Sequence, residues 1–148
     1  MQAKVQLLHG AQASTTEFNP RDLVRAFYER IWNGEDMDAA AELLAVDVSY
    51  RGGLGAEVCG RASLCDYVRT VRSALEDYRC EILDCVSERT KVFAKLRFSG
   101  VHVGSLRDRG PKARTVVWLG AALFRIEHRV ITEVWVLGDC TAAASSVS

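Results

Sequence analysis

The chain has 148 residues, of which 49% are hydrophobic and 26% are charged, and this composition is typical of one ordinary globular domain. Nineteen basic and nineteen acidic side chains give a formal net charge of zero, which removes the electrostatic argument for binding nucleic acid or an anionic membrane surface. No apolar run approaches the roughly 20 residues that span a bilayer, so we expect no membrane partner.

Cysteine and histidine usage predicts neither disulfides nor a metal site. The five cysteines, at 59, 65, 80, 85 and 140, are odd in number and form no C-x-x-C pair, which is typical of reduced thiols in a cytoplasmic protein. The three histidines, at 9, 102 and 128, lack the close spacing of zinc ligands. We therefore expect no metal and no cofactor.

The two ends of the chain are expected to lie outside the folded domain. Residues 1–18 are polar and lack periodicity, and residues 141–148 are mostly small, so we interpret them as a disordered arm and a flexible tail. The intervening segment, 19–140, shows no repeat and no linker. We predict that it forms a single domain.

Helix signals fill the first half of this domain. Asn19 and Pro20 are typical of a helix cap and a first helical turn. Apolar residues then recur at intervals of three and four up to Asn33-Gly34, which predicts an amphipathic helix. We expect a second short helix after Asp36, a short strand at 48–51 and a third helix that begins at Ser63.

Strand signals fill the second half. We expect strands at 78–87, 91–103, 115–126 and 130–137. The segment 105–114 is rich in basic residues, and it is either a solvated hairpin loop or a mobile lid over a cavity. Three helices followed by a meander of strands predict an α+β fold, with the helices packed on one face of a curved antiparallel sheet.

The strand at 91–103 carries the first candidate site residue. Its apolar positions, which alternate with mostly polar ones, are Val92, Ala94, Leu96 and Phe98. If the alternation continues, Gly100 and His102 fall on the same apolar face. His102 is then either a packed or surface histidine, or a hydrogen-bond donor and general acid–base group.

The pairing of the last two strands decides which other side chains share that face. If Glu127 pairs with Val130, one side of the hairpin carries Trp118, Ala122, Phe124, Glu133, Trp135 and Asp139. We expect this side to be the concave one, shared with Leu96, Phe98 and His102. A slip of one residue would reverse the assignment.

These side chains have alternative roles. Trp118 and Trp135 are either core aromatics or walls for a large apolar substrate. Asp139 is either exposed at a strand end or a base, and we expect Glu133 to pair with a basic neighbour. Further residues that could reach a cavity are Tyr28, Trp32, Tyr50 and Tyr67.

Three segments carry a family resemblance that covers residues 20–140: FYERIWNGEDMDAAAELLAVDVSY, FSGVHVG and LFRIEHRVITEVW. In this order they resemble the SnoaL-like polyketide cyclases of the nuclear-transport-factor-2-like (NTF2-like) superfamily. The resemblance implies a small α+β cone with an interior cavity. His102 matches the family histidine, whereas the catalytic aspartate of the cyclases falls at Ala122, which has no group that transfers a proton.

The resemblance implies a cofactor-independent cyclase that acts on a small apolar or polyketide-like substrate. Because Ala122 lacks a carboxylate, we expect ring closure without proton transfer, such as a cycloaddition of a linear polyene folded by the cavity walls, with His102 polarising a carbonyl. The alternatives are an isomerase, dehydratase or epoxide hydrolase that uses His102 with Asp139 or Glu133, and a non-catalytic small-molecule-binding protein. We also expect a homodimer through the apolar outer face of the last two long strands.

Overall fold

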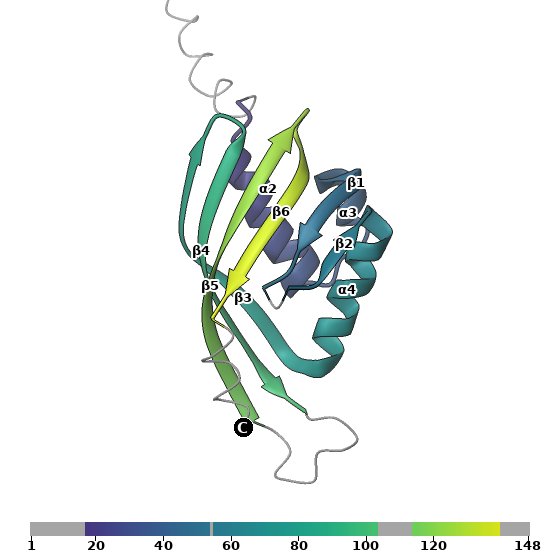
Figure 1. Ribbon diagram of the computed structural model, residues 1–148, viewed down its shortest axis with the longest axis vertical. Coiled ribbons are helices and arrows are strands. Elements are labelled where there is room, and N and C mark those ends of the chain that lie inside the picture. Colours follow the sequence, from purple (N-terminus) through teal and green to yellow (C-terminus); the bar gives the residue numbers. More distant parts are fainter. Residues whose placement is uncertain (1–16, 54, 104–113, 140–148) are drawn as a thin grey trace, which may run out of the picture.

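The computed structural model describes residues 17–53, 55–103 and 114–139. Figure 1 shows a curved, open sheet with the helices packed against it. Several sequence predictions concern residues outside this description. They are most of the arm at 1–18, most of the basic segment at 105–114, the tail at 141–148 and Cys140.

The N-terminal helical segment begins and ends where the sequence predicts, but it has two parts. Helix α2 (Pro20–Ala26) is capped by Asn19, whose side-chain oxygen accepts a hydrogen bond from the backbone N–H of Arg21 at 3.0 Å. It continues without a break into the π-helix η1 (Phe27–Asn33), which ends at Gly34. The wider turn of a π-helix is uncommon and is frequently found at functional sites.

The next elements alternate between helix and strand. Helix α3 (Ala39–Leu43) leads directly into β1 (Leu44–Arg51), and β2 (Glu57–Cys59) precedes α4 (Arg61–Ala74). Strand β1 is longer than the strand predicted at 48–51, because it begins as soon as α3 ends. It pairs antiparallel with β2, with Tyr50 opposite Val58.

Four long strands complete the sheet. They are β3 (Leu75–Glu88), β4 (Lys91–His102), β5 (Arg114–Glu127) and β6 (Val130–Gly138). The strand order is β2-β1-β6-β5-β4-β3, so β3 is an edge strand. All neighbouring pairs are antiparallel except β1 and β6, which run parallel.

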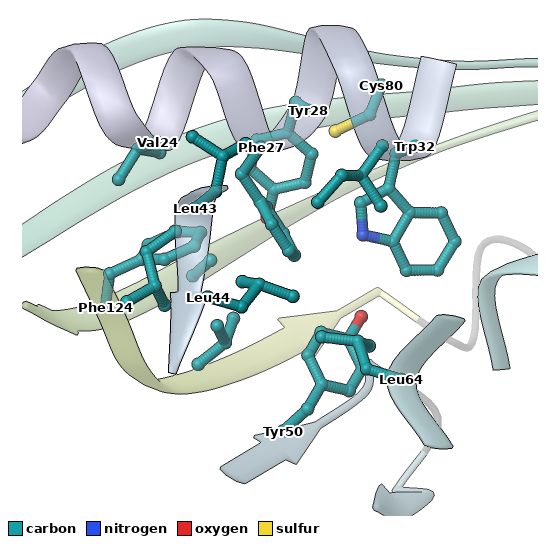
Figure 2. Close-up of a cluster of buried hydrophobic side chains, with 14 of the residues drawn as sticks. Val24, Phe27, Tyr28, Trp32, Leu43, Leu44, Tyr50, Leu64, Cys80 and Phe124 are labelled. Atoms are coloured by element: carbon teal, nitrogen blue, oxygen red, sulfur yellow. The ribbon is translucent and has the colours of Figure 1, made fainter. Parts of the chain in front are cut away.

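One face of the sheet forms the core with the helices. Along β4 the buried residues alternate with exposed ones, as the sequence predicts, and the buried set is Val92, Ala94, Leu96, Phe98 and Gly100. Opposite this face, α2 and η1 contribute Val24, Phe27, Tyr28 and Trp32. The rings of Phe27 and Tyr28 contact that of Phe124, with centroids 5.5 and 5.9 Å apart, whereas Trp32 lies farther along η1 (Figure 2). We call the sheet face that meets the helices the inner face, and the opposite one the outer face.

The turn between β5 and β6 is conformationally strained. His128 and Arg129 both have positive φ angles, 53° and 65°. Two-residue hairpins of this kind favour Asn-Gly or Asp-Gly, because other residues are disfavoured in the left-handed region. Arg129 places its guanidinium carbon 5.2 Å from the centroid of the Phe18 ring.

The predicted fold class is confirmed: the protein is α+β, with N-terminal helices and a curved six-stranded sheet. The sheet differs from the prediction in having one parallel pair, because β1 returns to the sheet beside β6 after α3. Among the helices that the structure describes, none is long and apolar enough to cross a membrane.

Candidate functional site

A β-bulge in the last hairpin decides which side chains point inward. Glu127 pairs with Val130 as predicted, but Arg125 pairs with Glu133 whereas Ile126 pairs with Ile131, so Thr132 is an extra residue on β6. The Thr132 hydroxyl donates to the backbone oxygen of Arg125 at 3.2 Å. Beyond the bulge every β6 side chain is therefore on the opposite face from the one that the unbulged register predicts.

The prediction that Trp135 and Glu133 lie on the concave face is therefore wrong. Trp135 is on the outer face, 43% exposed, with the Arg51 guanidinium carbon 5.4 Å from its ring centroid. Glu133 is exposed and pairs with Arg125 (Nε–Oε1, 3.3 Å), so its predicted basic partner is present. The β6 side chains that face inward are Val134 and Val136, and Val136 is opposite Ala122.

The remaining inner-face residues come from β4 and β5. Phe98 and Trp118 are directly paired, and their rings stack with centroids 5.2 Å apart and planes at 17°. Farther along the same strands, Ala94 pairs with Ala122, and Phe124 is fully buried. Ala122 thus stands in an apolar wall. None of the buried residues in the described ranges is charged.

The π-helix η1 supplies the aromatic residues that face this wall. Its Asn33 side chain fixes it to the edge strand β3, since Nδ2 donates to the Cys80 carbonyl at 3.0 Å and Oδ1 accepts from the Cys80 N–H at 2.8 Å. From α4, the Arg72 guanidinium donates to the Trp32 carbonyl at 2.8 Å. Tyr28 and Trp32 are both held inward and are 3% exposed.

Trp32 belongs to a group of four aromatic residues that each carry a polar atom. The group, which we call the Trp–Tyr cluster, consists of Trp32, Tyr50, Tyr67 and Tyr78. The ring centroids of Tyr50, Tyr67 and Tyr78 are 6.3, 6.1 and 5.3 Å from that of Trp32. Gly52 leaves room for this arrangement, because a Cβ atom there would be 2.6 Å from the Tyr67 hydroxyl oxygen.

Three members of the cluster, Trp32, Tyr50 and Tyr67, are predicted from the sequence as residues that could reach a cavity, whereas Tyr78 is not. Its position two residues before buried Cys80 would have revealed it by the same alternation that was used for β4. Tyr28 belongs to a separate contact, edge-to-face with Phe27 and Phe124 at 5.0 and 5.9 Å between centroids.

Burial keeps the tyrosine hydroxyls protonated. It raises the pKa of Tyr28, Tyr50 and Tyr78 well above the ordinary value, and it raises the pKa of the less buried Tyr67 in the same direction. The same cause raises the pKa of the Cys80 thiol. At neutral pH these groups are hydrogen-bonding groups without charge, because the ionised form is poorly solvated in an apolar interior.

His102 and Asp139 lie at different points of the sheet. His102 ends β4, is partly exposed, and pairs with Leu75 on one side and Arg114 on the other. Asp139 follows β6, is exposed, and its backbone N–H donates to the Leu119 carbonyl at 2.8 Å. Arg114 and Leu119 are five residues apart on β5, which corresponds to about 17 Å of strand.

The outer face has a groove that sequence reasoning did not identify. Its volume is about 520 Å³ and it lies over β2, β1 and β6, with Arg51, Glu57, Cys59 and Trp135 among its lining residues. The described residues include no group of three or more His, Cys, Asp or Glu side chains placed to hold a metal ion.

Comparison with known proteins identifies the class to which this protein belongs. The fold of the chain matches that of IdmH from Streptomyces antibioticus, which is provisionally assigned as a polyketide cyclase. The TM-score is 0.78, and the sequence identity is 19% over 88% of this chain and 99% of that one. A protein of Xanthomonas campestris pv. campestris with the same provisional assignment gives a TM-score of 0.71 and 30% identity over 87% and 96% of the two chains. Among curated proteins, none matches this sequence.

The family assignment agrees with these structures. The family model described as SnoaL-like polyketide cyclase matches residues 22–145. The chain therefore belongs to the SnoaL-like polyketide cyclase family, as its three sequence segments predicted.

Proposed function

We propose that the protein is a cofactor-independent cyclase that closes a ring in a polyketide-type intermediate without a catalytic carboxylate. The observation that supports this most is Ala122, which is 1% exposed within an apolar wall, at the position where the family resemblance implies a catalytic aspartate. An alanine methyl group offers no base for removing a proton beside a carbonyl. The proposed reaction is therefore one that needs conformational control more than proton transfer.

In this proposal the walls fold a linear substrate into a reactive shape. The sheet contributes Leu96, Phe98, Trp118, Ala122 and Phe124, and the helices and β1 contribute Tyr28, Trp32, Tyr50 and Tyr67. Restricting a flexible chain to a near-reactive geometry can lower a barrier by several kcal/mol, roughly 7 in well-oriented cases. His102 would polarise a carbonyl at the end of β4.

The finer proposal is a cycloaddition of a linear polyene. The chain also resembles the indane-forming cyclase of indanomycin biosynthesis, for which such a cycloaddition is proposed. That resemblance supports the reaction type only. We further propose that the protein works in the cytoplasm, in keeping with the four described cysteines, which form no disulfide.

A turnover assay with a synthetic conjugated polyene ketone tests the proposal. We expect the purified protein to speed ring closure, which is followed by the loss of the polyene absorbance, and Trp118→Ala to reduce that rate. Saturable binding without acceleration would indicate a non-catalytic binding protein instead. Formation of an isomerised, dehydrated or hydrolysed product with no new ring would favour the acid–base alternatives.

We also propose a homodimer through the outer face. Four exposed apolar side chains on successive strands are directly paired and form one row across the sheet: Val86, Phe93, Leu123 and Trp135. We call this the outer row. Leu119 and Leu137 extend it along β5 and β6, with 49% and 51% exposure. A second copy is the occupant we propose, because one self-complementary sheet face can cover the same face of another chain.

A further inference from the structure

The indole N–H of Trp32 is a buried donor for which the described part of the chain supplies no acceptor. Trp32 is 3% exposed, and its Nε1 has no hydrogen-bond partner among the described residues. Buried donors are nearly always paired in native structures, because an unpaired one has lost its hydrogen bond to water and gained nothing in return. An orphan donor in the interior therefore suggests an acceptor supplied by a ligand.

The neighbours of this donor define what the acceptor can be. Figure 2 shows the Tyr50 hydroxyl directed toward Trp32, on the same side as the indole nitrogen. Tyr50 and Tyr78 remain uncharged when buried, and no buried residue in the described ranges carries a charge. Uncharged donors within an apolar wall suit a neutral oxygen acceptor. The nearby Arg72 guanidinium is already engaged by the Trp32 carbonyl at 2.8 Å and by Glu35 (Nε–Oε1, 3.4 Å), so a carboxylate would lose its hydration without gaining a cationic partner of its own.

We propose that the Trp32 indole N–H, together with the Tyr50 hydroxyl, donates hydrogen bonds to a ketone or enol oxygen of the substrate. The inference rests on the proposed function in one respect only, that an apolar ligand enters this interior. These hydrogen bonds would orient the substrate, because they hold the oxygen-bearing carbon of an otherwise apolar molecule beside η1. Trp32 is then a residue that determines specificity.

Access to the donor requires a ring to move, and Tyr67 is the candidate. The Trp32 nitrogen is enclosed, whereas Tyr67 is the one member of the Trp–Tyr cluster that is partly exposed. It packs edge-to-face on Trp32, with planes at 83°. A side-chain rotation of this kind is common when a ligand binds.

Two probes of nearly equal size separate the hydrogen bond from apolar burial. 2-Acetylnaphthalene carries a ketone oxygen, and 2-ethylnaphthalene carries none. The dissociation constants of both are measured with the full-length wild-type chain and with Trp32→Phe, which keeps an aromatic ring and removes the N–H. Trp135→Phe is the matched control, because it makes the same exchange on the outer face.

We expect the wild-type protein to prefer the ketone, and Trp32→Phe to reduce that preference by about five- to tenfold, the factor of one net hydrogen bond. Trp135→Phe should leave the preference unchanged. In nitrogen-15 spectra, the indole N–H resonance that is missing from Trp32→Phe should move downfield with the ketone and not with the hydrocarbon. A purely structural tryptophan would give no such ketone-specific shift.

Each other result has a definite meaning. Equal binding of the two probes, an unchanged preference in Trp32→Phe, or an indole resonance that responds alike to both would overturn the inference while leaving an apolar binding site intact. Failure of both probes to saturate the wild-type protein would overturn the proposed function as well. If Trp32→Phe does not fold, the wild-type spectra and a reduced preference in Tyr50→Phe decide the question.

Discussion

Asn33→Ala should destabilise the protein, because the Asn33 side chain takes the place of a missing strand. β3 is at the edge of the sheet, and the backbone N–H and C=O of Cys80 that face away from β4 bind the two side-chain polar atoms of Asn33 at 2.8 and 3.0 Å. Each of these hydrogen bonds contributes about 1 kcal/mol net, and the Cys80 groups would be left unpaired in a mostly buried place. We expect the free energy of unfolding to fall by about 2 to 3 kcal/mol.

Urea denaturation followed by circular dichroism measures this change. Ser73→Ala is a suitable control, since it also removes a side chain hydrogen-bonded to a backbone carbonyl, that of Thr70 at 2.8 Å, but at an exposed position. We expect the control to change the unfolding free energy by less than about 0.5 kcal/mol. An equally small effect of Asn33→Ala would refute the interpretation that the end of η1 is held by this contact.

Three further predictions concern pH, assembly and the β5–β6 turn. Unfolded tyrosines ionise at about pH 10, whereas burial keeps Tyr28, Tyr50 and Tyr78 protonated in the folded protein. Above that pH the folded state therefore binds more protons than the unfolded state. The free energy of unfolding should then fall by about 1.4 kcal/mol per pH unit for each buried tyrosine. Urea denaturation at increasing pH should give a smaller slope for Tyr50→Phe, and an identical slope would contradict the assignment. Leu123→Lys, in the middle of the outer row, should convert the dimer to a monomer, as measured by light scattering. The control Val46→Lys lies outside that row and should leave the dimer intact. A wild-type protein that is monomeric at micromolar concentration would rule the dimer out. Replacing His128-Arg129 by Asn-Gly should raise the free energy of unfolding by about 1 kcal/mol, because both positions have positive φ angles, which Asn and Gly adopt more easily. A loss of stability would show instead that the Arg129–Phe18 contact contributes more than the backbone strain costs.

Local sequence signals, namely periodicity and helix capping, were enough to predict most of the helices and strands. The alternation from Val92 to Phe98 gave both the strand β4 and its inner face, and Asn19-Pro20 gave the start of α2. These signals are local, since each depends on residues within one or two turns or on one strand. The change from α- to π-helix at Phe27 has no such signal, because the same apolar stripe is compatible with both.

The site was harder to predict, because it depends on contacts between distant segments. The predicted position of Trp135 is wrong because of one extra residue, Thr132. This residue forms a β-bulge, so the β6 side chains that follow it point to the opposite face of the sheet. A period-two pattern cannot show such a bulge when both faces of the strand are apolar. Phe98 and Trp118 lie on β4 and β5, which pair without a bulge, and both residues are on the inner face, as predicted.

The central claim, that the walls rather than an acid–base group drive ring closure, is tested most directly by comparing the turnover rates of His102→Ala and Trp118→Ala on the polyene ketone. We expect His102→Ala to cost no more than about tenfold, the equivalent of one modest polar contact. Trp118→Ala should cost more, because it removes the ring that stacks on Phe98 and lets the substrate leave its reactive fold. The wild-type rate should vary little between about pH 6 and 8. A near-complete loss of turnover in His102→Ala or Asp139→Asn, together with a steep pH dependence, would contradict the account and indicate an acid–base mechanism.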